Sequence, residues 1–158
     1  MKNNSKYLGY FKNAEKKRED RLIGGEYEHF ILGENYQWTS YEEVVDIMRD
    51  LIEGNWEPDF VDGVLLGANA YGVHITLEPG SQFELSIEPQ KTVAELEKLY
   101  LRAMEDVLEV VERKGKKIYA LGYQPMASLD DIYLIDKKRY HHMFSYFGKK
   151  GPCAHNMM

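Results

Sequence analysis

Alternation of apolar and polar residues marks strands in the first half of the chain. Residues 22–32 read as one strand, and residues 63–69 and 72–78 read as two more. A tight turn near residues 70–72 (Ala-Tyr-Gly) joins the last two. These segments therefore predict a sheet that contains at least one hairpin.

The segment 75–86 carries carboxylates where a surface strand would tolerate Thr or Lys. Its alternation resumes after Pro79-Gly80. The apolar positions are Val73, Ile75, Leu77, Phe83, Leu85 and Ile87, and the polar positions between them are His74, Thr76, Glu78, Gln82, Glu84 and Ser86. Because successive side chains of a strand point to opposite faces, each polar set lies on one face. Acceptor oxygens on that face suit hard cations and the phosphates that they bind.

Helical spacing and capping residues predict the other elements. A short helix is expected over residues 5–19. Thr39 opens a second helix through a capping box with Glu42, and Gly54-Asn55 ends it.

The longest helix opens at Thr92 with a capping box to Glu95 and stops at Gly115. A strand follows over residues 118–123, and a last helix runs over residues 138–146. Strands that flank long helices, with one hairpin, indicate an α+β fold with a largely antiparallel sheet and flanking helices.

Composition narrows the class of protein. The chain has 158 residues, about one domain, and 44% of them are apolar, enough for a core. The net charge of −6 argues against an extended nucleic-acid groove. Cys153 is the single cysteine, which excludes an internal disulfide and fits a reducing compartment. With no run of about 20 apolar residues and no signal peptide, a soluble cytoplasmic protein without membrane or nucleic-acid partners is expected.

Glu26 and Glu28 stand two apart on a predicted strand, so both carboxylates lie on one face, roughly 6–7 Å apart at Cα. Their repulsion would be relieved by a cation such as Mg²⁺. A solvent-facing edge strand is the alternative. The preceding Gly24-Gly25 would allow close approach of a ligand or a neighbouring chain.

Glu78 and Glu84 form a second pair, separated by Pro79-Gly80. If the chain bends there, both carboxylates can point into one cavity. If it stays straight, they lie about 20 Å apart, too far to share a metal ion.

Arg139, within the basic run 137–139, has a planar guanidinium that can bind two oxygens of a carboxylate or phosphate at once. A solvated helix face is the alternative for such a run. The histidines show no zinc-ligand spacing, and no catalytic residue is assigned.

Four collinear motifs resemble the plant and proteobacterial type of glutamate–cysteine ligase, a carboxylate–amine ligase related to glutamine synthetase. Residues 23–30 (Ile-Gly-Gly-Glu-Tyr-Glu-His-Phe) are similar to its Ile-Gly-x-Glu-x-Glu-x-Phe motif. Residues 75–86 resemble its specific Thr-Leu-Glu-Pro-Gly-Gly-Gln-x-Glu-Leu-Ser signature, with Ser81 for the second Gly. Residues 120–125 resemble its Gly-x-Gly-(aromatic)-x-Pro strand, and residues 138–143 resemble Lys-Gly-Arg-Tyr-x-x-Met.

The resemblance implies an incomplete glutamine synthetase-like catalytic domain and a reaction. ATP would phosphorylate the γ-carboxylate of L-glutamate, and the amine of L-cysteine would attack the acyl phosphate, the first step of glutathione synthesis. The implied cofactor is Mg²⁺, with ATP as co-substrate. By resemblance, the metal ligands would be Glu26, Glu28, Glu84 and Glu78, and the substrate would contact Gln82 and Arg139.

Departures from the family pattern bear on what this chain can do. Residues 87–89 (Ile-Glu-Pro) replace the usual Ser-Gly-Ala-Pro-type ending, which affects the pocket after the signature. Met157-Met158 match the Met-Met at which family enzymes continue, so residues 1–158 are expected to be the N-terminal part of the catalytic domain, truncated and inactive alone. A frayed terminus is the alternative.

Two other functions stay open at this point. One keeps the fold and the ATP chemistry but ligates another amine to the γ-carboxylate. The other is a non-catalytic module that binds glutamate or a nucleotide. The sequence does not fix the oligomeric state.

Overall fold

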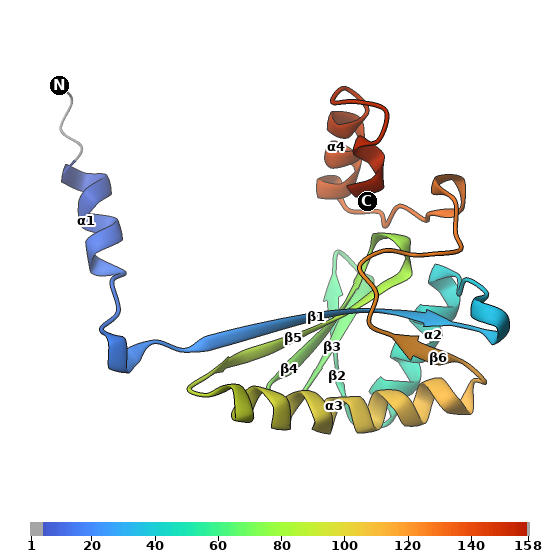
Figure 1. Cartoon of the computed structure of the whole chain (residues 1–158), viewed down its shortest axis with the longest axis horizontal. Coiled ribbons are helices and arrows are strands. Elements are labelled where there is room, and N and C mark those ends of the chain that lie inside the picture. The colour runs from blue at the N-terminus through green and yellow to red at the C-terminus, as the bar shows by residue number, and fades with distance from the viewer. Residues whose placement is uncertain (1–4, 158) are drawn as a thin grey trace.

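The computed structural model describes residues 5–157 and consists of one antiparallel sheet with helices on both sides (Figure 1). The sheet has six strands in the order β2-β3-β4-β5-β1-β6. The strands are β1 (Ile23–Leu32), β2 (Glu57–Val61), β3 (Val64–Ala70), β4 (Val73–Glu78), β5 (Gln82–Gln90) and β6 (Lys117–Tyr119). The helices are α1 (Ser5–Asn13), α2 (Tyr41–Glu53), α3 (Val93–Arg113) and α4 (Lys138–Phe147). The predicted α+β class with an antiparallel sheet is confirmed.

Helices α2 and α3 cover one face of the sheet, and the core lies between them. The strands contribute alternate apolar residues to this face, such as Ile75, Phe83 and Leu85, none of which is exposed. Tyr100 of α3 contacts Tyr27 of β1 with the ring centroids 4.7 Å apart. The polar residues between these positions therefore lie on the opposite face of the sheet.

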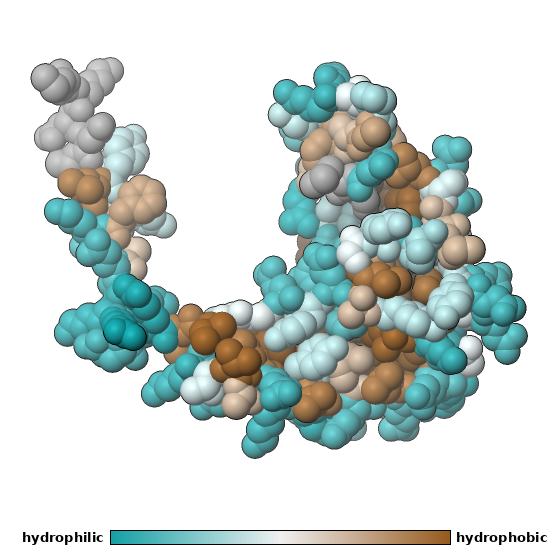
Figure 2. Space-filling view, viewed as in Figure 1, coloured by the Kyte–Doolittle hydropathy of each residue, from teal (hydrophilic) through white to brown (hydrophobic). Residues whose placement is uncertain are grey.

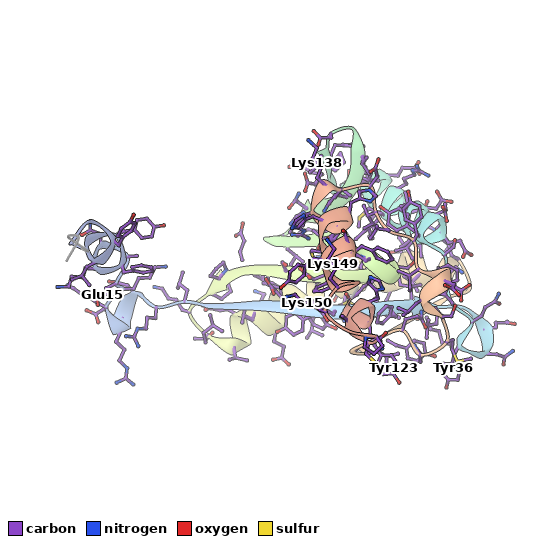
Figure 3. The ribbon with its side chains drawn as sticks, turned by 90° about the horizontal axis from the view of Figure 1, so that it is seen from above. Glu15, Tyr36, Tyr123, Lys138, Lys149 and Lys150 are labelled. Atoms are coloured by element: carbon purple, nitrogen blue, oxygen red, sulfur yellow. The ribbon has the colours of Figure 1, made fainter. Side chains whose placement is uncertain are left out.

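That opposite face, called the open face below, is partly covered by the C-terminal segment. Figure 1 shows α4 on the side of the sheet away from α3. Seen from above in Figure 3, α4 crosses the strands, with Lys138 at its start and Lys149 and Lys150 just past its end. Phe30 belongs to the open face by its position in β1 and is nevertheless buried, because the chain after β6 lies over it.

Several boundaries differ from the sequence predictions. Helix α1 ends at Asn13, not at residue 19, and residues 18–20 form a separate short 3-10 turn. The N-cap of α2 is Ser40, not Thr39, and its capping box partner is Glu43. Thr39 is buried, with its hydroxyl near the Lys116 ammonium.

The sequence prediction also missed β2 and made β6 too long. Strand β2 precedes an Asp62-Gly63 turn in which both residues have positive φ, the signature of a two-residue hairpin. Its Pro58 lies on an edge strand, where a missing N–H is tolerated. Strand β6 ends at Tyr119, so residues 120–125 are irregular and not the expected strand.

Helix α1 projects from the body on a thin connection (Figures 1 and 2). Its apolar side chains are exposed, including Tyr7, Leu8 and Phe11. Among the described residues no helix is long and apolar enough to cross a membrane.

The cap of α2 gives a direct stability test. Because the Ser40 hydroxyl accepts from the backbone N–H of Glu43, Ser40→Ala should lower the free energy of unfolding by about 1 kcal/mol. Ser145→Ala, an exposed change inside α4, is the control and should not destabilise. Urea denaturation measures both, and equal stability of Ser40→Ala and wild type would contradict the cap assignment.

The pairing of the cap residue Glu43 with Lys116 predicts a pH dependence of stability. A hydrogen bond from Lys116, 2.9 Å away, lowers the pKa of Glu43. A carboxylate with a lowered pKa contributes stability above its unfolded value of about 4.3, and this contribution is lost as the pH falls through the folded value. Glu43→Gln should therefore lose less stability than wild type between pH 6 and pH 3. Parallel stability–pH curves would contradict the pairing.

Candidate functional site

The register of three neighbouring strands places acidic residues side by side on the open face. Glu28 of β1 lies opposite Glu84 of β5, which lies opposite Thr76 of β4. Side chains directly opposite on antiparallel strands have Cβ atoms ~4.5–5.5 Å apart. Glu26 lies one row further, opposite Ser86. Glu26, Glu28 and Glu84 therefore form a contiguous group, called the carboxylate triad below.

Neutral donors partly compensate this group. The side-chain amide of Gln82 donates to Glu28 at 2.9 Å, and the Ser86 hydroxyl donates to Glu84 at 2.9 Å. Each bond occupies one oxygen of a carboxylate and leaves the other for a ligand. In this way Gln82 fixes the orientation of Glu28.

The chain bends between Glu78 and Glu84, which decides between the two geometries left open by the sequence. Residues 79–81 form a short turn between β4 and β5, and Gly80 and Ser81 there have φ values of 76° and 62°. Glu78 pairs with Gln82, and Glu84 pairs with Thr76. The two carboxylates thus lie on one face as diagonal neighbours, whose separation is ~7–8 Å.

Glu78 has different partners from the triad. It accepts a hydrogen bond from the hydroxyl of Tyr140 in α4, and the Arg139 guanidinium lies 3.6 Å from the same oxygen. Arg139 donates to the Tyr140 hydroxyl at 2.6 Å. Burial and the bond to Glu78 raise the pKa of Tyr140 to about 12, so its hydroxyl stays protonated at neutral pH.

Arg139 supplies positive charge near the triad. Its hydrogen bond to Tyr140 raises its pKa, and the charges of Glu78 and Glu84 add to this effect. The guanidinium pairs with Glu78 at 3.6 Å, at the end of the sheet where β4 turns into β5. A cation at this place lowers the repulsion among the carboxylates and can bind an anionic substrate group.

A cavity of about 800 Å³ opens beside this end of the sheet. Its floor includes Glu28, Phe30 and Gln82, and the turn at residues 79–80 closes one side. The opposite wall comes from the irregular chain after β6, with the other lining residues Gly122, Tyr123, Gln124, Pro125, Ala127, Ser128, Leu129, Ile132 and Asn156. Residues 122–125, which overlap the strand expected over residues 118–123, form part of this wall.

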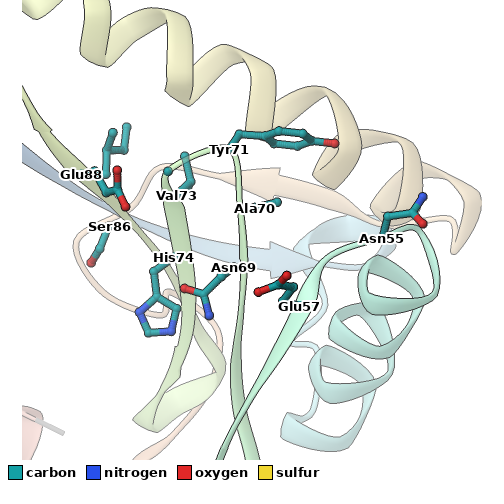
Figure 4. A pocket seen from close by; sticks show the side chains of 11 residues that line it. Asn55, Glu57, Asn69, Ala70, Tyr71, Val73, His74, Ser86 and Glu88 are labelled. Carbon is teal, nitrogen blue, oxygen red and sulfur yellow. The ribbon is translucent and has the colours of Figure 1, made fainter.

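A second cavity of about 580 Å³ lies at the other end of the open face (Figure 4). Glu57, Asn69 and His74 come from adjacent strands and line it together with Glu88. The His74 ring lies 3.3 Å from Asp59.

The donor set of the triad suits Mg²⁺, which prefers carboxylate oxygens and substrate phosphates. Glu26, Glu28 and Glu84 would hold the ion. Over residues 5–157 no three His, Cys, Asp or Glu side chains already converge as a metal site. The triad offers adjacent oxygens, and its side chains would have to rotate towards a shared ion.

Sequence reasoning missed two contributors to this region. The sequence marks Tyr140 only as a member of the motif at residues 138–143, and no local pattern indicates that its hydroxyl joins Glu78 to Arg139. Asn156 and the chain from 127 to 132 have no polar pattern that points to a cavity. Met158, the second residue of the terminal Met-Met, lies outside the described residues.

Comparison with known proteins agrees with this arrangement. Residues 22–158 match the model of the glutamate-cysteine ligase family 2 (GCS2). The chain is 30% identical over 153 residues to the chloroplastic glutamate–cysteine ligase B of Oryza sativa subsp. japonica, covering 96% of this chain and 31% of that protein. It is 30% identical to the chloroplastic glutamate–cysteine ligase of Solanum lycopersicum, again over 96% of this chain, and covers 29% of that protein. The chloroplastic glutamate–cysteine ligase of Arabidopsis thaliana is 28% identical, over 96% of this chain and 29% of that protein. The chain thus spans less than a third of the length of these relatives.

The close approach of Glu28 and Glu84 predicts a gain in stability when one charge is removed. Without metal, Glu84→Gln should raise the free energy of unfolding by about 0.5 kcal/mol at low salt, because like charges directly opposite on a sheet repel. The gain should shrink in 1 M NaCl. Glu97→Gln on the exposed side of α3 is the control. A salt-independent loss of stability in Glu84→Gln would contradict the geometry.

Ser81 predicts a second gain. Its φ is 62°, its side chain is buried, and among the described residues its hydroxyl has no hydrogen-bond partner. Ser81→Gly should therefore stabilise the protein by about 1 kcal/mol, because Gly adopts positive φ without strain and removes the buried hydroxyl. Chemical denaturation measures this, and a destabilised variant would show that Ser81 makes a favourable contact.

Proposed function

Because the chain belongs to glutamate–cysteine ligase family 2, we propose that it forms part of the site for ATP-dependent ligation of L-cysteine to L-glutamate. The reaction makes γ-glutamylcysteine through a γ-glutamyl phosphate, the first step of glutathione biosynthesis. The observation that carries the proposal is the carboxylate triad on one sheet face, with Arg139 of α4 paired to the neighbouring Glu78. Since the chain covers about 31% of the rice relative, the activity, substrates and partners of a whole enzyme are proposals.

Phosphoryl transfer depends mainly on positioning of the reactants and neutralisation of their charge, and different residues of the open face would supply each. Glu26, Glu28 and Glu84 would hold Mg²⁺. A bound Mg²⁺ supplies positive charge to the phosphate oxygens of ATP and to the phosphoryl group in transfer. The triad lies on a sheet anchored by α2 and α3, so its backbone positions are set before ligands bind and only its side chains have to rotate.

Arg139 and Gln82 would orient the substrate. Arg139 carries five N–H donors, and its bond to Tyr140 uses one of them. The others can bind a carboxylate of glutamate or a phosphoryl oxygen as negative charge develops there. Gln82 lines the larger cavity and holds Glu28 through its amide. Its carbonyl oxygen is left for the substrate amino group.

Enclosure of the cavity serves the acyl phosphate chemistry. Phe30 is buried in its floor, and residues 122–132 form its far wall. Such a wall limits the access of water to an intermediate that water would hydrolyse. Attack by the amine then competes better with hydrolysis.

A γ-glutamyl ligase with another amine acceptor is the second candidate. Glu88 belongs to the segment 87–89 that departs from the family ending, and it lines the second cavity together with Glu57. Two carboxylates in this cavity favour an amine acceptor that carries an additional positive charge, which the cysteine side chain does not supply. A cytoplasmic location stays a prediction, and the curated relatives named above are chloroplastic.

The test uses both the chain and a chimera. In the chimera, this chain replaces the segment of the rice ligase that it matches. We expect little product from the chain alone, and formation of ADP and γ-glutamylcysteine by the chimera when ATP, Mg²⁺, L-glutamate and L-cysteine are present. Glu84→Gln in the chimera should lower the rate at least ~100-fold, since a metal clamp contributes several kcal/mol to the transition state.

A control and a contradicting result complete this test. Glu97→Gln, far from the open face on α3, should leave the rate of the chimera unchanged. A panel of amines in place of cysteine decides the acceptor. A folded chimera with equal rates for Glu84→Gln and wild type would overturn the assignment of the triad.

A further inference from the structure

Helix α4 contacts the core through Tyr140 and through the half-buried Met143. The structure describes every residue of α4. Among them only Tyr140 is buried, with 2% of its surface exposed. The aromatic residues further along the helix, Phe144 and Tyr146, are exposed. Tyr140 is also hydrogen-bonded to β4, so the position of α4 over the open face depends on how Tyr140 is held as well as on the packing of Met143.

The Tyr140 hydroxyl acts as both a hydrogen-bond donor and an acceptor. The hydroxyl donates to the Glu78 carboxylate and accepts from the Arg139 guanidinium. The guanidinium carbon also lies 4.7 Å from the centroid of the Tyr140 ring. A hydrogen bond to a charged group is stronger than one between neutral groups, so the Tyr140 hydroxyl links the three side chains firmly.

The same contact separates Glu78 from the carboxylate triad. One oxygen of Glu78 faces both Tyr140 and Arg139, whereas Glu28 and Glu84 have only neutral donors among the described residues. Glu78 thus already has a cation of this chain beside it. A metal ion bound at the same oxygen would deprive the buried Tyr140 hydroxyl of its acceptor, and an ion at the other oxygen would be repelled by the Arg139 guanidinium.

We propose that Tyr140 is a positioning residue that binds Glu78 and Arg139 through one hydroxyl, so that Glu78 anchors the substrate-binding arginine and is not a metal ligand. The proposal rests on the function proposed above, because that function makes Arg139 a substrate-binding residue. It changes the role of Glu78, which the resemblance grouped with Glu26, Glu28 and Glu84. Three of the acidic residues then bind the cation, and the fourth, Glu78, holds Arg139 in place.

The first experiment follows the Arg139 guanidinium by NMR in the chain labelled with ¹⁵N-arginine. A guanidinium held by Tyr140 gives slowly exchanging N–H signals. Tyr140→Phe keeps the ring and its stacking but should abolish these signals, and it should lower Tm by roughly 3–10 °C. Tyr146→Phe, on the same helix, is the matched control and should change neither. Retained Arg139 signals in Tyr140→Phe would overturn the proposal.

The second experiment measures binding of Mn²⁺, as a probe for Mg²⁺, by EPR. Glu78→Gln keeps an acceptor for Tyr140 and should bind Mn²⁺ within about twofold of wild type, whereas Glu84→Gln should bind at least ~10-fold more weakly. Equal weakening in the two variants would make Glu78 a ligand and overturn the proposal. If wild type binds no Mn²⁺, the proposed cation site fails, and the Arg139 signals alone decide the role of Tyr140.

Discussion

The antiparallel register of β1, β5 and β4 is the constraint on which the rest of the structure depends. It sets Glu28 opposite Glu84 and turns Glu78 back onto the same face. A shift of one residue in either pairing would move these carboxylates into the core and bring Phe83 and Leu85 to the surface. The apolar contacts with α3 that prevent such a shift, including Tyr27 against Tyr100, therefore also maintain the site.

Carboxylates on the open face repel one another, and neighbouring groups reduce this repulsion. Three carboxylates lie close together, with Gln82, Ser86 and Arg139 as the nearest compensating groups. Stability lost to such repulsion is recovered when a cation binds, because any ligand that binds only the folded state stabilises it. Tyr140 links this acidic region to the segment that covers it.

Much of this could be predicted from the sequence, because local periodicity carries it. Period-two alternation identified the faces of β4 and β5, and the capping box at Thr92 identified the start of α3. The turn at Pro79-Gly80 was visible, but its direction depends on pairing between strands and had to come from the structure. Strand β2 was missed although its Asp62-Gly63 turn is a hairpin signal, because its own residues hardly alternate. The contact of Tyr140 with Glu78 joins residues 62 positions apart, and no local pattern reports it.

The central claim is that the register of the sheet builds a cation site from Glu26, Glu28 and Glu84. The most direct measurement is calorimetric titration of the chain with Mn²⁺, for wild type and for the double variant Glu28→Gln/Glu84→Gln. We expect saturable binding near one ion per chain in wild type and its loss in the folded double variant. Undiminished binding in the double variant, or no saturable binding in wild type, would contradict it.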